Sequence, residues 1–155
     1  MKAKIIYGTN SGGTKVLSEF IAELLKKSGW SVKLQSAESA EPEDIKDNDL
    51  VIFGSCTWGV PTKSGYLDGQ LQQHFRSFEH KLHGHSFKGQ KFAVFGLGDS
   101  TMYRNFAAAS EHLEKIVEHL KGNLIIEPLK VDNYFFEPKA NQKIVRQWTD
   151  TLLKK

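Results

Sequence analysis

The chain has 155 residues, of which 39% are hydrophobic and 11% aromatic, a composition typical of a globular domain with one substantial core. Its 21 basic and 18 acidic side chains give a net charge of +3, which is too small to indicate nucleic-acid binding. No apolar run could span a bilayer, the N-terminus lacks a signal-peptide core, and the single cysteine excludes an internal disulfide framework, so we expect a cytoplasmic protein.

Apolar runs alternate with amphipathic stretches along the whole chain, which is typical of a parallel sheet with helices on both faces. The apolar runs predict strands at residues 3–7, 30–34, 50–54, 91–96 and 124–131, the last interrupted by Pro128. Helical spacing predicts helices that begin near Lys15, span residues 42–47, 67–78 and 106–120, and begin again near Pro138. We therefore predict an α/β, doubly wound fold with a five-stranded parallel sheet, residues 1–155 forming one domain.

Three segments of unusual composition follow predicted strands, at residues 9–14, 55–65 and 97–105. Ligands of open parallel sheets bind beyond the carboxyl ends of the strands, so these segments are candidate binding loops. The first reads Thr9-Asn10-Ser11-Gly12-Gly13-Thr14 and opens a helix, where free backbone N–H groups and the helix dipole favour a phosphate. It predicts a phosphate site, the alternative being a turn that only caps the helix.

Two nucleotide-binding motifs are excluded by the order of residues. Residues 8–15 approach a Walker phosphate loop, but Thr14 precedes Lys15, whereas the motif needs the lysine first and the hydroxyl after it. A dinucleotide fingerprint needs a third glycine, which neither the first segment nor Gly96-Leu97-Gly98 supplies. A loop of neutral donors suits a terminal monophosphate instead.

Each of the other two segments carries an aromatic side chain in a polar, glycine-rich context. Trp58 follows the strand at residues 50–54, and Tyr103 follows the strand at residues 91–96. A flat ring in such a place can stack on a planar ligand, although partial burial in an ordinary loop is the alternative for each ring taken singly. Together with the phosphate loop they predict a planar ring system with a phosphate tail.

These residues resemble the flavodoxin family of small carriers of flavin mononucleotide (FMN). The phosphate loop matches the family pattern Thr/Ser-x-Thr/Ser-Gly-x-Thr, and residues 54–59 and 95–100 are similar to the segments that bring the stacking tryptophan and tyrosine. The resemblance covers the whole chain and implies the strand order 2-1-3-4-5. Because the last strand lacks a long insertion, the chain is similar to the short-chain members.

The resemblance implies non-covalent FMN binding by residues of all three segments, with the ring between Trp58 and Tyr103. Some members place the tyrosine one position earlier, where this chain has Met102. The implied cofactor-binding residues are Thr9, Asn10, Ser11, Gly12, Gly13, Thr14, Cys56, Thr57, Trp58, Gly59, Leu97, Gly98, Asp99, Tyr103 and Phe106.

The implied function is that of a monomeric, low-potential electron carrier without catalytic residues, which moves electrons between a separate reductase and an acceptor enzyme. Two alternatives on the same fold stay open: an FMN-dependent quinone or nitro-compound reductase, and an auxiliary or maturation factor, including an adaptor that has lost the cofactor. Rapid reduction by NAD(P)H alone would indicate the first, and failure to bind added FMN would indicate the adaptor.

The chain departs from the family at the expected flavin rim, where no acidic residue stands between Trp58 and Asp68. Because fewer carboxylates repel the fully reduced, anionic flavin, the second one-electron potential is expected to be less negative than in typical members.

The basic and histidine-rich residues 74–91 are expected to weaken or reverse charge complementarity with redox partners. Cys56 stands where members often have a hydroxyl and is expected to be a packing residue, and no metal site is expected at His80, His83 and His85, whose spacing fits no strong template.

Overall fold

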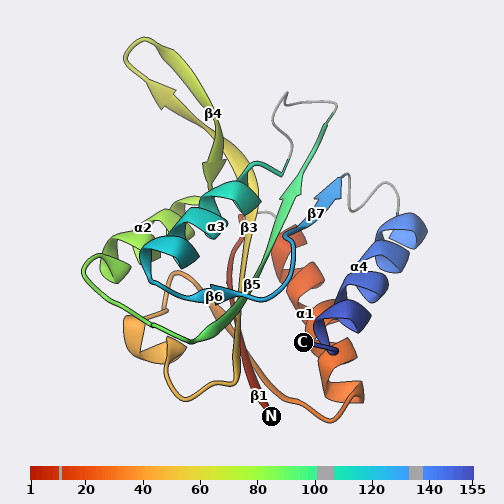
Figure 1. The fold of residues 1–155 in the computed structure, drawn as a ribbon. Coiled ribbons are helices and arrows are strands. Elements are labelled where there is room, and N and C mark those ends of the chain that lie inside the picture. The colour runs from red at the N-terminus through yellow and green to blue at the C-terminus, as the bar shows by residue number, and fades with distance from the viewer. Residues whose placement is uncertain (11, 101–106, 133–137) are drawn as a thin grey trace.

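A computed structural model describes residues 1–10, 12–100, 107–132 and 138–155 (Figure 1). The strands are β1 (Lys2–Gly8), β2 (Ser31–Ser36), β3 (Leu50–Thr62), β4 (Gly65–Leu71), β5 (Lys91–Gly98), β6 (Asn123–Leu124) and β7 (Leu129–Asp132). The helices are α1 (Gly13–Lys27), α2 (Gln73–Leu82), α3 (Ala109–His119) and α4 (Pro138–Leu152), with a short 3₁₀ helix, η1 (Pro42–Ile45). None of the helices in the described part of the chain is both long and apolar enough to cross a membrane.

The strands form a parallel sheet in the order β2-β1-β3-β5-β6, with β7 also beside β5, which confirms the predicted doubly wound order. Residues 125–128, which include Pro128, separate β6 from β7, so the expected interruption of the last strand is present and is short. Helices α1 and α4 cover one face of the sheet and α2 and α3 cover the other (Figure 1).

Two apolar layers fill the space between the sheet and its helices, because the central strands are apolar on both faces. On the α2–α3 side, Phe53 contacts the rings of Phe75, Phe78 and Phe92, with centroids 5.2–6.1 Å apart. On the other side, Ile5 and Ile52 pack with residues of α1 and α4, among them Leu17 and Val145. This rigid body fixes the positions at which β1, β3 and β5 end.

One predicted helix is wrong in its first half. Residues 67–71 belong to β4, which pairs antiparallel with the far end of β3, and the helix begins only at Gln73. The segment after the central strand is correspondingly a β-hairpin that rises above the body of the protein, and not the loop expected at residues 55–65 (Figure 1). The helix expected from residue 106 begins at Ala109.

Candidate functional site

The first binding segment lies between the end of β1 and the start of α1. Gly12 adopts φ +88°, a left-handed conformation that suits glycine, and its N–H donates to Thr9 Oγ1 at 3.0 Å. Glycine has no side chain with which to cap the helix, and the first turn of α1 carries no acidic residue. The N-terminal end of α1 therefore keeps its positive electrostatic character toward this segment. Ser11 lies outside the described residues.

Thr14, in the first turn of α1, is the decisive side chain of this segment. The residue is 1% exposed, and its Oγ1 is buried without a hydrogen-bond partner among the described residues. A buried hydroxyl that makes no hydrogen bond is unfavourable by about 1–3 kcal/mol. Such an atom at a helix N-terminus fits a hydrogen bond to a ligand oxygen, as a phosphate would supply.

Gln72 connects the first segment to the hairpin and to α2. Its Nε2 donates to Asn10 Oδ1 and, at 3.4 Å, to the carbonyl oxygen of Thr9. Its Oε1 accepts from the backbone N–H groups of His74 and Phe75 at 2.9 and 3.3 Å, which caps α2. The side chain that begins one helix therefore also holds the candidate phosphate loop in place.

The second segment places Trp58 within β3, where a loop was expected. Its Nε1–H donates to Cys56 Sγ at 2.9 Å, and the Cys56 thiol lies 3.9 Å from the carbonyl oxygen of Gly8 at the end of β1. Cys56 thus links the tryptophan to the strand that carries the phosphate segment. The register of β3 against β4 shifts between Trp58 and Val60, because Gly59 alone stands opposite two residues of β4, the second of which is Gly69 with φ +77°. The extra residue of this irregularity therefore belongs to β4.

Thr57 precedes Trp58 in β3, so its side chain points to the opposite face of the strand, and the residue is 8% exposed. Its Oγ1 accepts from the backbone N–H of Ala109 at 3.2 Å, which satisfies a donor at the start of α3. The Thr57 hydroxyl therefore positions the start of α3. Any contribution of Thr57 to a ligand would therefore come from its backbone.

The third segment begins at the end of β5, directly beside β3. Leu97 is opposite Cys56 in the register of β3 and β5, and Gly98 is opposite Asp132 at the end of β7. The carboxylate of Asp132 accepts from the backbone N–H of Ser100 at 2.9 Å and from its hydroxyl, which ties this segment to the edge of the sheet. Met102, Tyr103 and Phe106 lie outside the described residues.

The structure therefore gathers the ends of β1, β3 and β5, with Cys56 bridging the first two. Sequence reasoning missed Gln72 and Asp132, which touch the segments without belonging to them. If the helix had been predicted to begin after Gly69, Gln72 would have been recognised as its capping residue. Asp132 could have been recognised as a polar residue at the end of a strand. Within the described parts of the chain, no group of three or more His, Cys, Asp or Glu could hold a metal ion.

Comparison with known proteins agrees with this geometry. The family model described as Flavodoxin matches residues 5–148. The chain belongs to the flavodoxin family. It is 31% identical over 132 residues to the flavodoxin of Maridesulfovibrio salexigens, which covers 84% of this chain and 86% of that protein.

Solved flavodoxins share the fold over nearly the full length of both chains. Oxidised flavodoxin 2 from Bacillus cereus is 26% identical, with a TM-score of 0.85 and coverage of 99% of each chain. The flavodoxin of Fusobacterium nucleatum bound to flavin mononucleotide is 21% identical, with a TM-score of 0.82 and coverage of 99% and 97%. Members of the family are FMN-binding electron carriers and not enzymes, so the chain is an electron carrier with FMN as its cofactor, and redox proteins are its partners.

Proposed function

We propose that the three segments form the FMN site of this electron carrier. The backbone N–H groups at the start of α1, with Thr9, Ser11 and Thr14, would hold the phosphate, and Trp58 and Tyr103 would cover the two faces of the ring. The observation that supports this most directly is the buried Oγ1 of Thr14, which has no hydrogen-bond partner among the described residues and lies beside a helix start without a side-chain cap. Bound FMN supplies the one-electron chemistry, while the protein supplies binding, orientation and electrostatics.

Hydrogen bonds within the protein indicate which of the other residues would orient the FMN-binding groups. Gln72 holds Thr9 and Asn10, and Cys56 holds the indole of Trp58, so both would orient the residues that touch FMN. Backbone groups of Thr57, Gly59, Gly98 and Asp99 would face the polar edge of the ring. The first two follow Cys56, the last residue of β3 that pairs with β5, and the other two lie at or directly after the end of β5. Leu97 and Phe106 would complete the apolar surroundings.

The proposal extends to the partners and the compartment. The protein would act as a monomer, with residues 1–155 as one domain that takes electrons from a separate reductase and delivers them to an acceptor enzyme. A cytoplasmic location fits the single cysteine, Cys56, which is a free thiol.

The substitution Thr14→Val tests the phosphate assignment. Because a hydrogen bond to a charged group contributes roughly 1.5–3 kcal/mol, FMN affinity should fall about tenfold to hundredfold, measured by quenching of flavin fluorescence on titration of the apoprotein. The apoprotein should be as stable as wild type or more so, because the hydroxyl that is lost has no partner there.

Thr149→Val is the matched control, since the Thr149 hydroxyl donates to the Val145 carbonyl within α4. It should lower stability modestly and leave FMN affinity unchanged. Unchanged FMN affinity in Thr14→Val, with a lower stability of its apoprotein, would contradict the assignment and indicate a purely structural threonine.

The partner proposal is tested by mixing the FMN-loaded protein anaerobically with NADPH, with and without a flavodoxin reductase. Bleaching of the flavin absorbance should be slow with NADPH alone and accelerate strongly when the reductase is added. Equally rapid bleaching with NADPH alone would overturn the need for a separate donor.

A further inference from the structure

A second polar region lies at the opposite end of the sheet from the FMN site, where β1 and β2 begin (Figure 1). A pocket of about 280 Å³ is bounded there by the first residues of both strands and by η1 with the turn after it. Its walls carry the lysines Lys2, Lys4, Lys33 and Lys46. Since a water needs only about 10–15 Å³, the pocket has room for an ion of many heavy atoms.

The lysines of the strands stand on one face of the sheet in adjacent positions. The parallel register places Lys4 directly beside Lys33, and Lys2 two residues before Lys4 projects to the same side. Farther along β1 on the same face, Ile6 belongs to the apolar core. The lysines therefore occupy the end of a sheet face that is otherwise apolar and buried. Neighbouring like charges are destabilising unless an anion compensates them.

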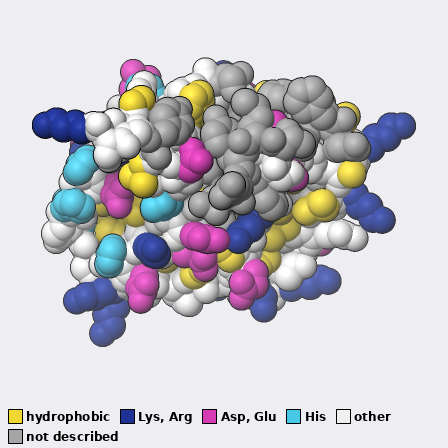
Figure 2. Space-filling model, turned by 90° about the horizontal axis from the view of Figure 1, so that it is seen from above, with side chains coloured by type: hydrophobic (Ala, Val, Ile, Leu, Met, Phe, Trp, Pro, Cys, Tyr) yellow, Lys and Arg dark blue, Asp and Glu magenta, His cyan; other side chains and the backbone are white. Residues whose placement is uncertain are grey.

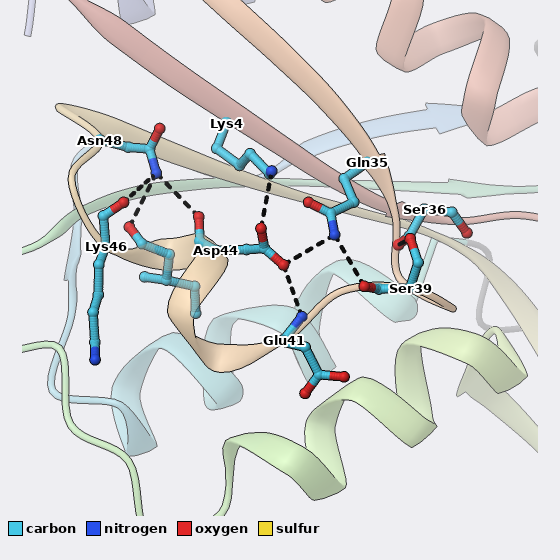
Figure 3. Close-up of polar contacts among 9 residues, drawn as sticks. Lys4, Gln35, Ser36, Ser39, Glu41, Asp44, Lys46 and Asn48 are labelled. Atoms are coloured by element: carbon cyan, nitrogen blue, oxygen red, sulfur yellow. Dashed lines mark hydrogen bonds and ion pairs between the residues drawn. The ribbon is translucent and has the colours of Figure 1, made fainter.

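Asp44 compensates the charge of Lys4 (Figure 3). Lys4 is 9% exposed, and its Nζ donates to Asp44 Oδ1 at 3.2 Å. The other oxygen of Asp44 is already engaged, because it accepts from Gln35 Nε2 and from the backbone N–H of Glu41, both at 2.9 Å. Asp44 therefore has little capacity left for a second lysine.

With Lys4 and Asp44 paired, the pocket wall keeps three other lysines against two other carboxylates, an excess of one positive charge. Lys46 pairs with Glu43 at 3.9 Å, whereas the ammonium groups of Lys2 and Lys33 have no ion-pair partner among the described residues. Asp47 is the one carboxylate of the pocket wall that makes no ion pair or hydrogen bond within that part of the chain. Lys4 also keeps two of its three donor hydrogens.

We propose that this pocket binds a compact diphosphate anion, held by Lys2, Lys4 and Lys33. Ammonium groups on these two neighbouring strands can contact two phosphoryl groups at once, which a single phosphate could not span as well. The same chemistry is offered by inorganic pyrophosphate and by the diphosphate of a nucleotide. The site is separate from the FMN phosphate loop, because it lies at the amino ends of the strands and not at their carboxyl ends.

The test uses the FMN-saturated protein, so that the phosphate loop is not free to take the probe. Pyrophosphate and ADP are titrated separately in magnesium-free buffer of constant ionic strength, followed by calorimetry and by backbone amide NMR signals. Binding of either should shift the signals of Lys2, Lys33 and Asn48. Binding of both would show that the diphosphate group is recognised, and binding of one would identify its source.

Lys33→Gln should weaken pyrophosphate binding roughly tenfold or more, because it removes a charged donor without breaking an ion pair of the protein. Lys26→Gln, in the last turn of α1, is the matched control and should bind as wild type. The thermal stability of Lys33→Gln without ligand should be no lower than wild type, which checks the fold. The proposal is overturned if neither anion shifts those signals beyond the effect of equal ionic strength of NaCl, or if Lys33→Gln binds like wild type.

Discussion

Gln72 is a fully buried amide whose two polar atoms serve different segments. Its oxygen caps α2, and its nitrogen holds Thr9 and Asn10. We expect Gln72→Met to lower the free energy of unfolding of the apoprotein by about 2 kcal/mol, because a helix cap and buried hydrogen bonds are lost together. FMN affinity should fall severalfold as well, because Thr9 and Asn10 of the proposed phosphate segment lose their hydrogen bonds to Gln72. Chemical denaturation and flavin fluorescence titration measure the two effects.

The neighbouring Gln73→Met is the control for this prediction. Gln73 is exposed at the first position of α2, so its substitution should change neither quantity appreciably. If Gln72→Met destabilised the protein but bound FMN as tightly as wild type, Gln72 would be a helix cap alone.

Asp44 illustrates how a partly buried carboxylate is kept ionised (Figure 3). Burial raises the pKa of Asp44, but hydrogen bonds from the Glu41 N–H and Lys4, attraction to the Lys4 charge, and a hydrogen bond from Gln35 outweigh it and hold the pKa below 3.8. Because the folded-state pKa is lowered, this stabilisation is present above pH 3.8 and disappears as the pH falls below that value. Asp44→Asn should therefore be less stable than wild type at pH 7, and the difference should shrink below pH 3.8, as urea unfolding at a series of pH values can show.

At the scale of elements, helix α3 carries an unfavourable charge. Burial raises the pKa of Glu114, and repulsion from Glu127 and Glu111 raises it further, while Lys130 opposes the rise only in part. Because the pKa is raised, the ionised carboxylate destabilises the folded protein above pH 4.5 and has no such effect well below it. Glu114→Gln should increase the melting temperature at pH 7, and the gain should vanish in acid.

Glu118→Gln on the same helix is the control, because Glu118 is exposed and makes no ion pair among the described residues. Its melting temperature should stay within error of wild type. An equal increase in both variants would point to the net charge of the protein as the cause, and not to the surroundings of Glu114.

The β3–β4 hairpin is the element that sequence reasoning could not recover. Leu67 was the first residue of the helix predicted at residues 67–78, yet it lies on β4 and is 52% exposed. The pairing that makes β4 a strand is between distant positions such as Thr57 and Leu71, and neither partner alone shows it. The spacing of apolar residues was sufficient to predict elements that pack on the core, such as β5 and α4, because burial of one face makes apolar residues recur at regular intervals. It failed in the outer part of the hairpin, where residues 61–65, 67 and 68 are exposed to solvent.

At the scale of the molecule, the strand order followed from the family resemblance and the alternation of apolar and amphipathic segments. That the three candidate segments lie near one another followed too, because parallel strands end at one edge of the sheet, although the second segment is a hairpin and not the expected loop. What joins the segments could not be predicted, since Gln72 and Asp132 act across 62 and 32 residues of sequence. Long-range side-chain bonds leave no periodic signal in the chain.

The charge distribution of the whole protein bears on its redox potential. Figure 2, which views the molecule from above, shows Asp and Glu side chains interspersed with Lys, Arg and His over the described part of this face. The hairpin beyond Trp58 adds Lys63 and no carboxylate before Asp68. Because a second electron makes the bound flavin anionic, nearby carboxylates would oppose it by Coulomb repulsion. We expect the second one-electron potential to be less negative than in acidic flavodoxins.

Adding charge to the hairpin tests this argument directly. Thr62 and Ser64 are exposed near its tip, so the double substitution Thr62→Glu with Ser64→Glu should leave the fold intact and make the second potential more negative by on the order of tens of millivolts. Thr62→Gln with Ser64→Gln is the neutral control and should leave the potential unchanged. Both are measured by anaerobic redox titration at low and high salt, and the effect should shrink at high salt as screening increases. The argument would be contradicted by a strongly negative second potential in the wild-type protein, or by no response to the added carboxylates. Either result would mean that contacts close to the ring set the potential, and that the lack of carboxylates between Trp58 and Asp68 does not.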